Sequence, residues 1–287
     1  MMAMFWPFRL ICHCRQSGCV YPWSSMRRVR LLTFNIAHAR GPLLHQSLRR
    51  EARLRANLLK IARLIVRLDV DIVALQEIDE NSRWSGSFNH LEFLQQHTGL
   101  THAVHGVHNR RVGLYHLNYG NALLSRYPVH HHELVAFGRR SVGEKGFLFA
   151  ELETPAGRVP VVNVHLDHRS RPVRLRQAVR LGDYLDSQRT HRGSRWRTGP
   201  LVCGDLNCAA GKPDATESLL EHLGRSCPYT LWPQGRTGRT FPSLWPQRAL
   251  DYVYLPEDCR QPEATVIRSM LSDHRPVLVE FSLSSHN

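Results

Sequence analysis

Two polar residues stand just after a short apolar run in the second half of the chain. The run 201–203 is typical of a buried strand, Gly204 then breaks it, and Asp205 and Asn207 follow. If strand geometry persists to Asn207, both polar side chains point to the same side, because side chains alternate along a strand. A carboxylate and an amide held side by side can bind and activate one water molecule. The same residues would also suit an ordinary polar turn.

Polar residues also stand at the ends of five other expected strands. The full set is Asn35, Glu77, His165, Asp205 with Asn207, Asp251, and Asp273 with His274. Each has an ordinary alternative, such as a turn cap, a surface carboxylate, a core histidine or a charge at a strand edge. Oxygen ligands and two histidines, each at the end of an apolar run, rarely coincide by chance. Oxygen ligands without cysteine suit Mg²⁺ or Mn²⁺, and such a set favours metal-assisted phosphate hydrolysis.

Apolar runs and amphipathic segments predict the elements that position these residues. We expect strands at 29–35, 70–75, 121–125, 147–152, 159–166, 201–203, 250–255 and 276–281, and helices at 48–68, 88–98, 172–185 and 214–223. Strands and helices alternate, but hairpin-like pairs also occur, so a mixed rather than a purely parallel sheet is expected. Three histidines at 130–132 are expected in an exposed polar turn. No repeat, linker or domain boundary is evident, which favours one domain.

Composition indicates an ordinary globular chain of 287 residues, with 42% hydrophobic and 22% charged residues. The net charge of +14 suggests a polyanionic partner, so nucleic acid is a candidate. Only three of the 38 basic residues are lysines, and this arginine excess fits coding bias as well as it fits a phosphate-binding surface. Four cysteines, at 203, 208, 227 and 259, are isolated thiols typical of a reducing compartment, which predicts a cytoplasmic protein. We expect no transmembrane segment and a monomer.

The first 25 residues differ from the rest of the chain. Their apolar patch is interrupted by Arg9, His13 and Arg15, and is too short and polar to span a bilayer or to act as a signal peptide. Met26 then leads directly into the first expected strand. We therefore predict that residues 1–25 are a disordered or non-native extension, and that residues 26–287 form a single catalytic domain.

Seven segments resemble, in order, the endonuclease/exonuclease/phosphatase superfamily. They are TFNIAHARG (33–41), DIVALQEID (71–79), YGNALLSRYPV (119–129), VVNVHLDHR (161–169), LVCGDLNC (201–208), ALDYVYLP (249–256) and SDHRPVLVEF (272–281). The superfamily includes deoxyribonucleases, abasic-site endonucleases, sphingomyelinases and inositol-polyphosphate phosphatases. The resemblance covers nearly all of the chain after Met26.

The resemblance implies a four-layer α/β/β/α sandwich of two packed mixed sheets, with the site where their strand ends meet. It also implies a role for each position. Glu77 would be the principal Mg²⁺ ligand (Mn²⁺ is the alternative), supported by Asn35 and with Asp273 close to the metal. Asp205 would orient or deprotonate the attacking water, and Asn207 would position the phosphate. His165 would donate to a phosphoryl oxygen, and Asp251 would pair with His274, the second phosphate-contacting histidine.

Two departures bear on the substrate. Abasic-site enzymes carry an acidic or amide residue and then glycine where this chain has Ala37 and His38. They also carry a lysine shortly after the Gln-Glu pair, where this chain has Ile78 and Asp79. These departures argue against abasic-site repair without excluding nuclease activity. The resemblance as a whole predicts a Mg²⁺-dependent phosphoesterase, with a phosphodiesterase favoured. A DNA or RNA nuclease is the first alternative, and a catalytically silent binding protein on the same fold is the second.

Overall fold

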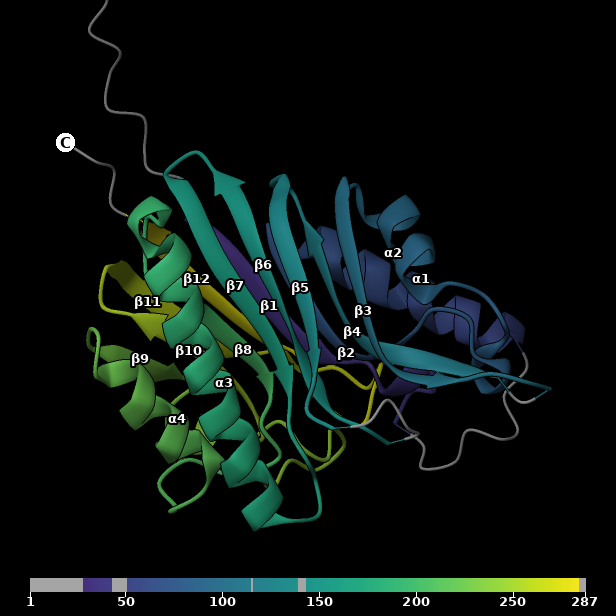
Figure 1. Ribbon diagram of the computed structural model, residues 1–287. Helices are drawn as coiled ribbons and strands as arrows, with labels where there is room; N and C mark the ends of the chain where they lie inside the picture. The colour runs from purple at the N-terminus through teal and green to yellow at the C-terminus, as the bar shows by residue number, and fades with distance from the viewer. Residues whose placement is uncertain (1–27, 43–50, 115, 139–142, 284–287) are drawn as a thin grey trace, which may run out of the picture.

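The computed structural model describes residues 28–42, 51–114, 116–138 and 143–283. The predicted extension 1–25 and the first three residues of the predicted helix 48–68 lie outside these ranges. Within the described ranges, strands and helices follow one another in an order that brings distant segments together (Figure 1).

Two mixed sheets of six strands each lie face to face. The first has the order β11 (Cys259–Val266), β12 (Val277–Leu283), β1 (Val29–Asn35), β2 (Ile72–Asp79), β4 (Leu117–Ser125) and β3 (His102–Arg111). The second has the order β5 (Val129–Ala136), β6 (Gly146–Thr154), β7 (Gly157–His165), β8 (Leu201–Asp205), β10 (Asp251–Pro256) and β9 (Tyr229–Trp232). Each sheet has one parallel pair at its centre, β1 with β2 and β7 with β8.

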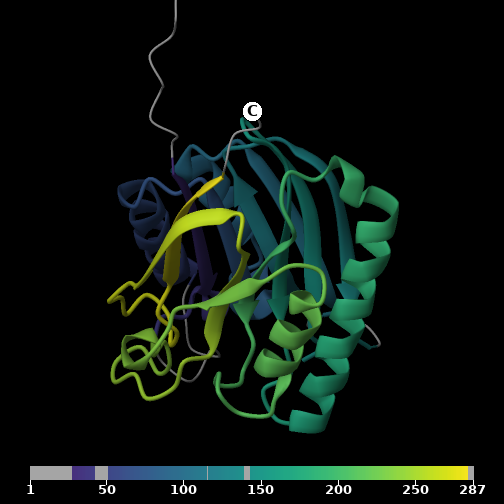
Figure 2. The ribbon, with the colours of Figure 1, turned by 90° about the vertical axis from the view of Figure 1, so that its left-hand side faces the viewer.

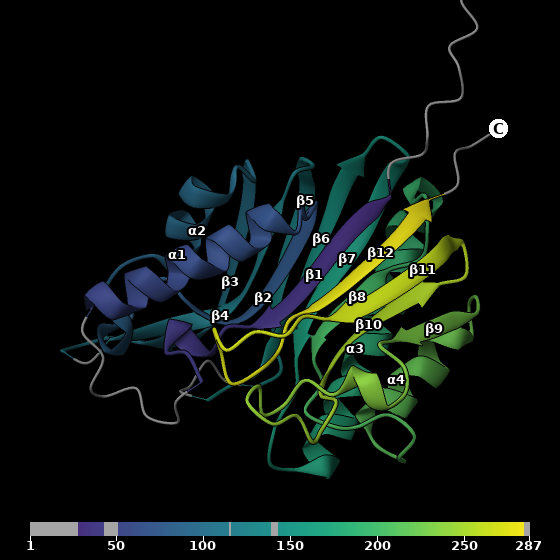
Figure 3. The same ribbon diagram turned by 180° about the vertical axis from the view of Figure 1, so that it is seen from behind.

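Helices cover the outer faces of the two sheets (Figures 1 and 3). α1 (Glu51–Arg67) and α2 (His90–Thr98) pack on the first sheet, and α3 (Arg171–Arg192) and α4 (Ala215–Gly224) pack on the second. The predicted four-layer α/β/β/α sandwich is therefore confirmed. Among the described helices, none is both long and apolar enough to cross a membrane.

Alternation along the central strands divides the core into three layers. In β1, Leu31 packs between the sheets, whereas Leu32 points to the opposite face and packs in the layer beneath α1. Leu181 of α3 belongs to the third layer, on the outer face of the second sheet. Both faces of a central strand are thus covered, so its sequence is almost continuously apolar, and this made these strands visible in the sequence.

The strands that the sequence did not reveal, β3, β5, β9 and β11, are the four edge strands of the two sheets. The predicted turn at 130–132 was wrong, because these histidines lie in β5, where half-buried residues alternate with exposed ones. Edge strands carry polar and charged residues on the side that faces solvent, so they lack the apolar run that marks a central strand.

A buried polar cluster joins the sheets just below the strand ends. Asn163 donates its Nδ2 protons to two main-chain oxygens of the first sheet, both at 2.8 Å, and its Oδ1 accepts from Gln76 Nε2 at 2.7 Å. Asn121 in turn donates to the Asn163 main-chain oxygen at 3.0 Å. Because Gln76 precedes Glu77 and Asn163 lies two residues before His165, the cluster fixes one sheet's strand ends relative to the other's.

Candidate active site

The polar residues predicted at the strand ends lie at one edge of the sandwich. The parallel pairs place the carboxyl ends of β1, β2, β7 and β8 there, and β10, antiparallel to β8, begins there. Most of the predicted residues line a cavity of about 240 Å³: Asn35, Glu77, His165, Asp205, Asn207, Asp273 and His274. The remaining one, Asp251, is fully buried behind His274.

Asp205 connects the two sheets within this cavity. Its Oδ2 accepts a hydrogen bond from Asn35 Nδ2 at 3.0 Å, and it lies 3.4 Å from His165 Nε2 and 3.7 Å from His274 Nε2. Burial and the nearby Asp251 carboxylate raise the pKa of Asp205 to about 6, although His274 acts in the opposite direction. A carboxylate with such a pKa can exchange a proton near neutral pH.

The prediction that Gly204 breaks the strand was wrong, because β8 continues through it to Asp205. Gly204 has φ +144°, and a Cβ there would lie 1.8 Å from the Val164 main-chain oxygen of β7, so glycine permits this close approach. The strand instead ends before Asn207, which has φ +53°. Strand alternation therefore does not reach Asn207, whose Nδ2 donates to the Leu166 main-chain oxygen at 3.0 Å while the residue still lines the cavity.

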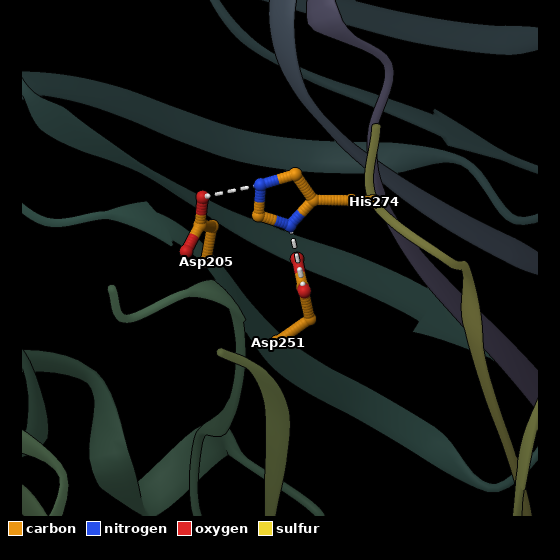
Figure 4. Close-up of side chains that lie close together, drawn as sticks. All are labelled: Asp205, Asp251 and His274. Atoms are coloured by element: carbon orange, nitrogen blue, oxygen red, sulfur yellow. Dashed lines mark hydrogen bonds and ion pairs between the residues drawn. The ribbon is translucent and has the colours of Figure 1, made fainter. Parts of the chain in front are cut away.

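Asp251 and His274 form a buried pair, with 2.8 Å between Asp251 Oδ2 and His274 Nδ1 (Figure 4). Figure 4 shows the imidazole between two carboxylates, with Asp251 at one ring nitrogen and Asp205 facing the other. Burial disfavours the charged ring, but Asp251 and Asp205 outweigh it and raise the pKa of His274 to about 10. The ring is therefore an imidazolium at neutral pH, with Nε2 directed to the cavity side.

Glu77 occupies a bulge in β2 and has φ +52°, unusual for a residue other than glycine. Its carboxylate oxygens lie 3.4 Å from His38 Nε2, 3.6 Å from Lys145 Nζ and 4.0 Å from His165 Nε2. Burial opposes ionisation, but Lys145 and then His38 hold the pKa of Glu77 well below its usual range. Glu77 is thus an ionised carboxylate with cationic or titratable groups around it.

Lys145 is a cavity-lining residue that the sequence analysis did not select. It is 9% exposed, and its Nζ lies 2.8 Å from His165 Nε2. Burial and the Lys145 ammonium hold the pKa of His165 well below its ordinary value, so this ring is neutral. The available signal was its rarity, since this chain uses arginine for nearly all of its basic positions.

The two sequence departures meet in the structure. His38 Nδ1 lies 2.8 Å from Asp79 Oδ2, and Trp84 Nε1 donates to the other oxygen of Asp79 at 2.9 Å. The His38 ring also lies 4.9 Å, centroid to centroid, from both Trp84 and Tyr119. His38 thereby directs its second nitrogen to Glu77 and lies next to the cavity. Neither departure alone indicated this position for His38.

The cavity fits a divalent cation on the side of the first sheet. Glu77 has a side chain 21% exposed and, within the described residues, accepts no hydrogen bond, while Asn35 and Asp273 add oxygens to the lining. These are the ligand types that Mg²⁺ and Mn²⁺ prefer. Asp205, Asp251 and His274 also offer ligand atoms within 4.8 Å of one another, but there His274 Nδ1 is already bonded to Asp251.

Comparison with known proteins gives the chain its family. A model of the endonuclease/exonuclease/phosphatase family matches residues 32–274, which include every residue of the cavity. The chain belongs to this family. Members generally hydrolyse phosphoester bonds and generally depend on a divalent metal.

Curated relatives of this family member include the uncharacterized protein YbhP of Escherichia coli K12, 30% identical over 171 residues. The match covers 58% of this chain and 64% of YbhP, so the chain spans less than two thirds of the length of that relative.

Solved structures show the same fold at low identity. TDP2 from Caenorhabditis elegans matches 89% of this chain and 75% of its own, with a TM-score of 0.61 and 18% identity. The endonuclease/exonuclease/phosphatase from Bacteroides vulgatus matches 90% of this chain and 99% of its own (TM-score 0.66, 16% identity). A mannosyl-6-phosphatase from Bacteroides thetaiotaomicron matches 89% of this chain and 100% of its own (TM-score 0.63, 12% identity).

Proposed function

We propose that this family member is a Mg²⁺- or Mn²⁺-dependent phosphodiesterase that hydrolyses its substrate by in-line attack of water. The observation that carries the proposal is the position of Asp205. Its carboxylate lies within 4 Å of His165 and His274 and is bonded to Asn35, whose neighbour strand supplies Glu77. A proton acceptor, two imidazoles and a separate anionic metal ligand thus face one cavity.

Glu77 would hold the cation, with Asn35 and Asp273 adding oxygens. When bound, Mg²⁺ or Mn²⁺ would polarise a phosphoryl oxygen and neutralise charge in the transition state. Asp273 also pairs with Arg40, another residue of the cavity lining.

Asp205 takes the proton from the attacking water, for which a pKa of about 6 is well placed. The water oxygen forms its bond to phosphorus while the bond from phosphorus to the leaving oxygen breaks on the opposite side. The leaving group departs as an oxyanion, which takes a proton from solvent where its basicity requires one. The His274 imidazolium donates from Nε2 to a non-bridging oxygen as charge develops there, and Asp251 holds the ring in that orientation.

His165, Lys145 and Asn207 would contact the same phosphate group. Lys145 brings a buried ammonium next to His165, so the charge of the scissile phosphate is matched from the second sheet as well as by the cation. Asn207, two residues after Asp205, also lines the cavity and contributes its polar group there.

A nuclease is the second candidate, and the net charge of +14 favours it. A catalytically silent binding protein is disfavoured, since each expected catalytic position holds a competent residue. We further propose that residues 26–287 act as one catalytic domain, since the family match runs through both sheets.

The test is a substrate panel with Mg²⁺ and with excess chelator. We expect metal-dependent release of 4-nitrophenolate from bis(4-nitrophenyl) phosphate, at a higher rate than from 4-nitrophenyl phosphate, and its loss in the Asp205→Asn variant. Plasmid DNA in the same panel distinguishes the nuclease. Failure of the folded protein to hydrolyse any of the three with either metal would contradict the proposed function.

A further inference from the structure

A second, larger cavity of about 910 Å³ lies beside the catalytic cavity. It is bounded by α4, by β9 and by the segments 207–214, 233–239 and 247–250. Figure 2 shows α4 and β9 on the side of the ribbon that faces the viewer. Asn207, Arg248 and Leu250 line both cavities, so the two adjoin one another. A substrate whose scissile phosphate occupies the catalytic cavity can therefore extend into this groove.

The groove has an excess of positive charge. Lys212, Arg239 and Arg248 are exposed on it, and in the described part of the chain none of the three side chains has a carboxylate partner. Arg248 instead lies over the Phe241 ring, at 4.9 Å from its centroid. On the acidic side, Glu217 only accepts a main-chain hydrogen bond from Gly211. Three such cations against one carboxylate favour an anionic ligand.

One wall of the groove is fixed by a neutral pair. Arg174 of α3 donates from Nε to Asp214 at 3.2 Å, and Asp214 caps the start of α4 by accepting from the Ala215 N–H at 2.7 Å. The opposite charges of Arg174 and Asp214 neutralise each other, so the pair adds no attraction for an anion. It holds the segment that carries Lys212 against α3 and α4, which preorganises the groove.

The floor of the groove is apolar and aromatic. Leu231 and Tyr252 are buried beneath it, and Tyr229 and Leu220 are partly exposed along it. The Tyr252 hydroxyl accepts from the Ala210 N–H at 3.0 Å and so fixes the loop after β8. A purely ionic ligand would leave this surface unused, whereas a ligand with a flat or apolar body would cover it.

We propose that this groove binds the part of the substrate beyond the scissile phosphate, and that this part carries a second phosphate on an apolar or aromatic body. This inference rests on the proposed function and narrows it to diesters with a further anionic group. A cationic headgroup of the choline type would be repelled by Lys212 and Arg239, and a neutral one would gain nothing from them.

Three chromogenic diesters with the same leaving group test this. They are 4-nitrophenylphosphorylcholine, thymidine 5′-(4-nitrophenyl phosphate), and the latter carrying a 3′-phosphate; their groups beyond the scissile phosphate are cationic, neutral and anionic. We expect kcat/KM to rise in this order, with a gain of about tenfold from the 3′-phosphate, as one charge-assisted contact can supply. The gain should lie mainly in KM and should shrink with added salt.

The groove variant is the double substitution Lys212→Gln with Arg239→Gln. We expect it to lose most of the preference for the 3′-phosphate. The matched control is Lys60→Gln with Arg260→Gln, which removes the same charge from exposed sites on α1 and β11 and should keep the preference. A flat or reversed order in the unmodified protein, or equal loss in both double variants, would overturn the groove proposal while leaving the phosphodiesterase in place.

A binding measurement keeps the two proposals separate. Calorimetry should find that thymidine 3′,5′-bisphosphate binds the unmodified protein more tightly than thymidine 5′-phosphate does, and that the groove variant removes the difference. If none of the diesters is hydrolysed, the proposed function fails. The groove proposal then stands or falls on this difference in affinity alone.

Discussion

The two sheets contribute to the site in different ways. In the first sheet, Asn35 ends the regular strand β1, but Glu77 lies in a bulge of β2, and three consecutive residues, Ala37 to Ala39, have positive φ. The second supplies His165, Asp205 and Asp251 from regular strand ends, where Asp205 is the register partner of the other two. The first sheet thus presents Glu77 by local strain, whereas the second places His165, Asp205 and Asp251 side by side through strand pairing.

The largest expected effects are on activity, and metal binding then distinguishes the residue of the first sheet, Glu77, from that of the second, Asp205. We expect Glu77→Gln and Asp205→Asn each to lower kcat/KM by about a thousandfold or more, because a metal ligand or a general base is lost. Only Glu77→Gln should also weaken Mn²⁺ binding measured by calorimetry. Asp205→Asn, on the other sheet, is the matched control. Equal loss of Mn²⁺ affinity in both variants would mean that the cation is shared between the sheets.

The next effect probes the pair of Asp251, on the second sheet, and His274, which lies just before β12 of the first sheet. We expect His274→Ala to lower kcat/KM by about 10²- to 10³-fold, as loss of a transition-state donor does. Asp251→Asn should cost less and move the alkaline limb of the pH–rate profile to lower pH. Asp251 helps to raise the pKa of His274 to about 10, so without this carboxylate the ring loses its proton at lower pH.

The double variant completes this test, because two residues that act as one unit are not additive. His274→Ala with Asp251→Asn should be little worse than His274→Ala alone. Independent losses that multiply across the four proteins would show that Asp251 does not act through His274.

A smaller effect concerns His38, which lies beside Glu77 of the first sheet. We expect His38→Asn to weaken Mn²⁺ binding by about tenfold, because His38 connects Asp79 to Glu77 and outer partners of metal ligands have effects of this size. Asparagine tolerates the positive φ of this position but is too short to bridge the two carboxylates. The control is His97→Asn at an exposed position on α2, which should bind Mn²⁺ as the unmodified protein does.

The smallest expected effect concerns the amino-terminal residues. A chain that starts at Met26 should keep the melting temperature and kcat/KM of the full chain, because β1 begins at Val29 and both halves of the site lie beyond it. A clear decrease in either quantity would show that residues 1–25 belong to the fold.

The same contrast explains what the sequence could reveal. Central strands are covered on both faces and read as apolar runs, so their positions and the polar residues at their ends were predictable. The four edge strands lack such a run and were missed. His38 and Asp79 were seen only as departures, because the expected strand 70–75 stopped short of the bulge that carries β2 on to Asp79. Bulges and positive φ depend on tertiary contacts that no local pattern encodes.

The position of β1 between β2 and β12 has a consequence for synthesis of the chain. β1 pairs with β2 early, but its other edge pairs with β12, which is made last among the described strands. Until β12 has left the ribosome, the growing chain carries an open strand edge next to a site in which His274 is not yet fixed in position. During that interval, the nascent protein should be prone to strand-to-strand association, and a chaperone that shields β1 would raise the yield of folded protein.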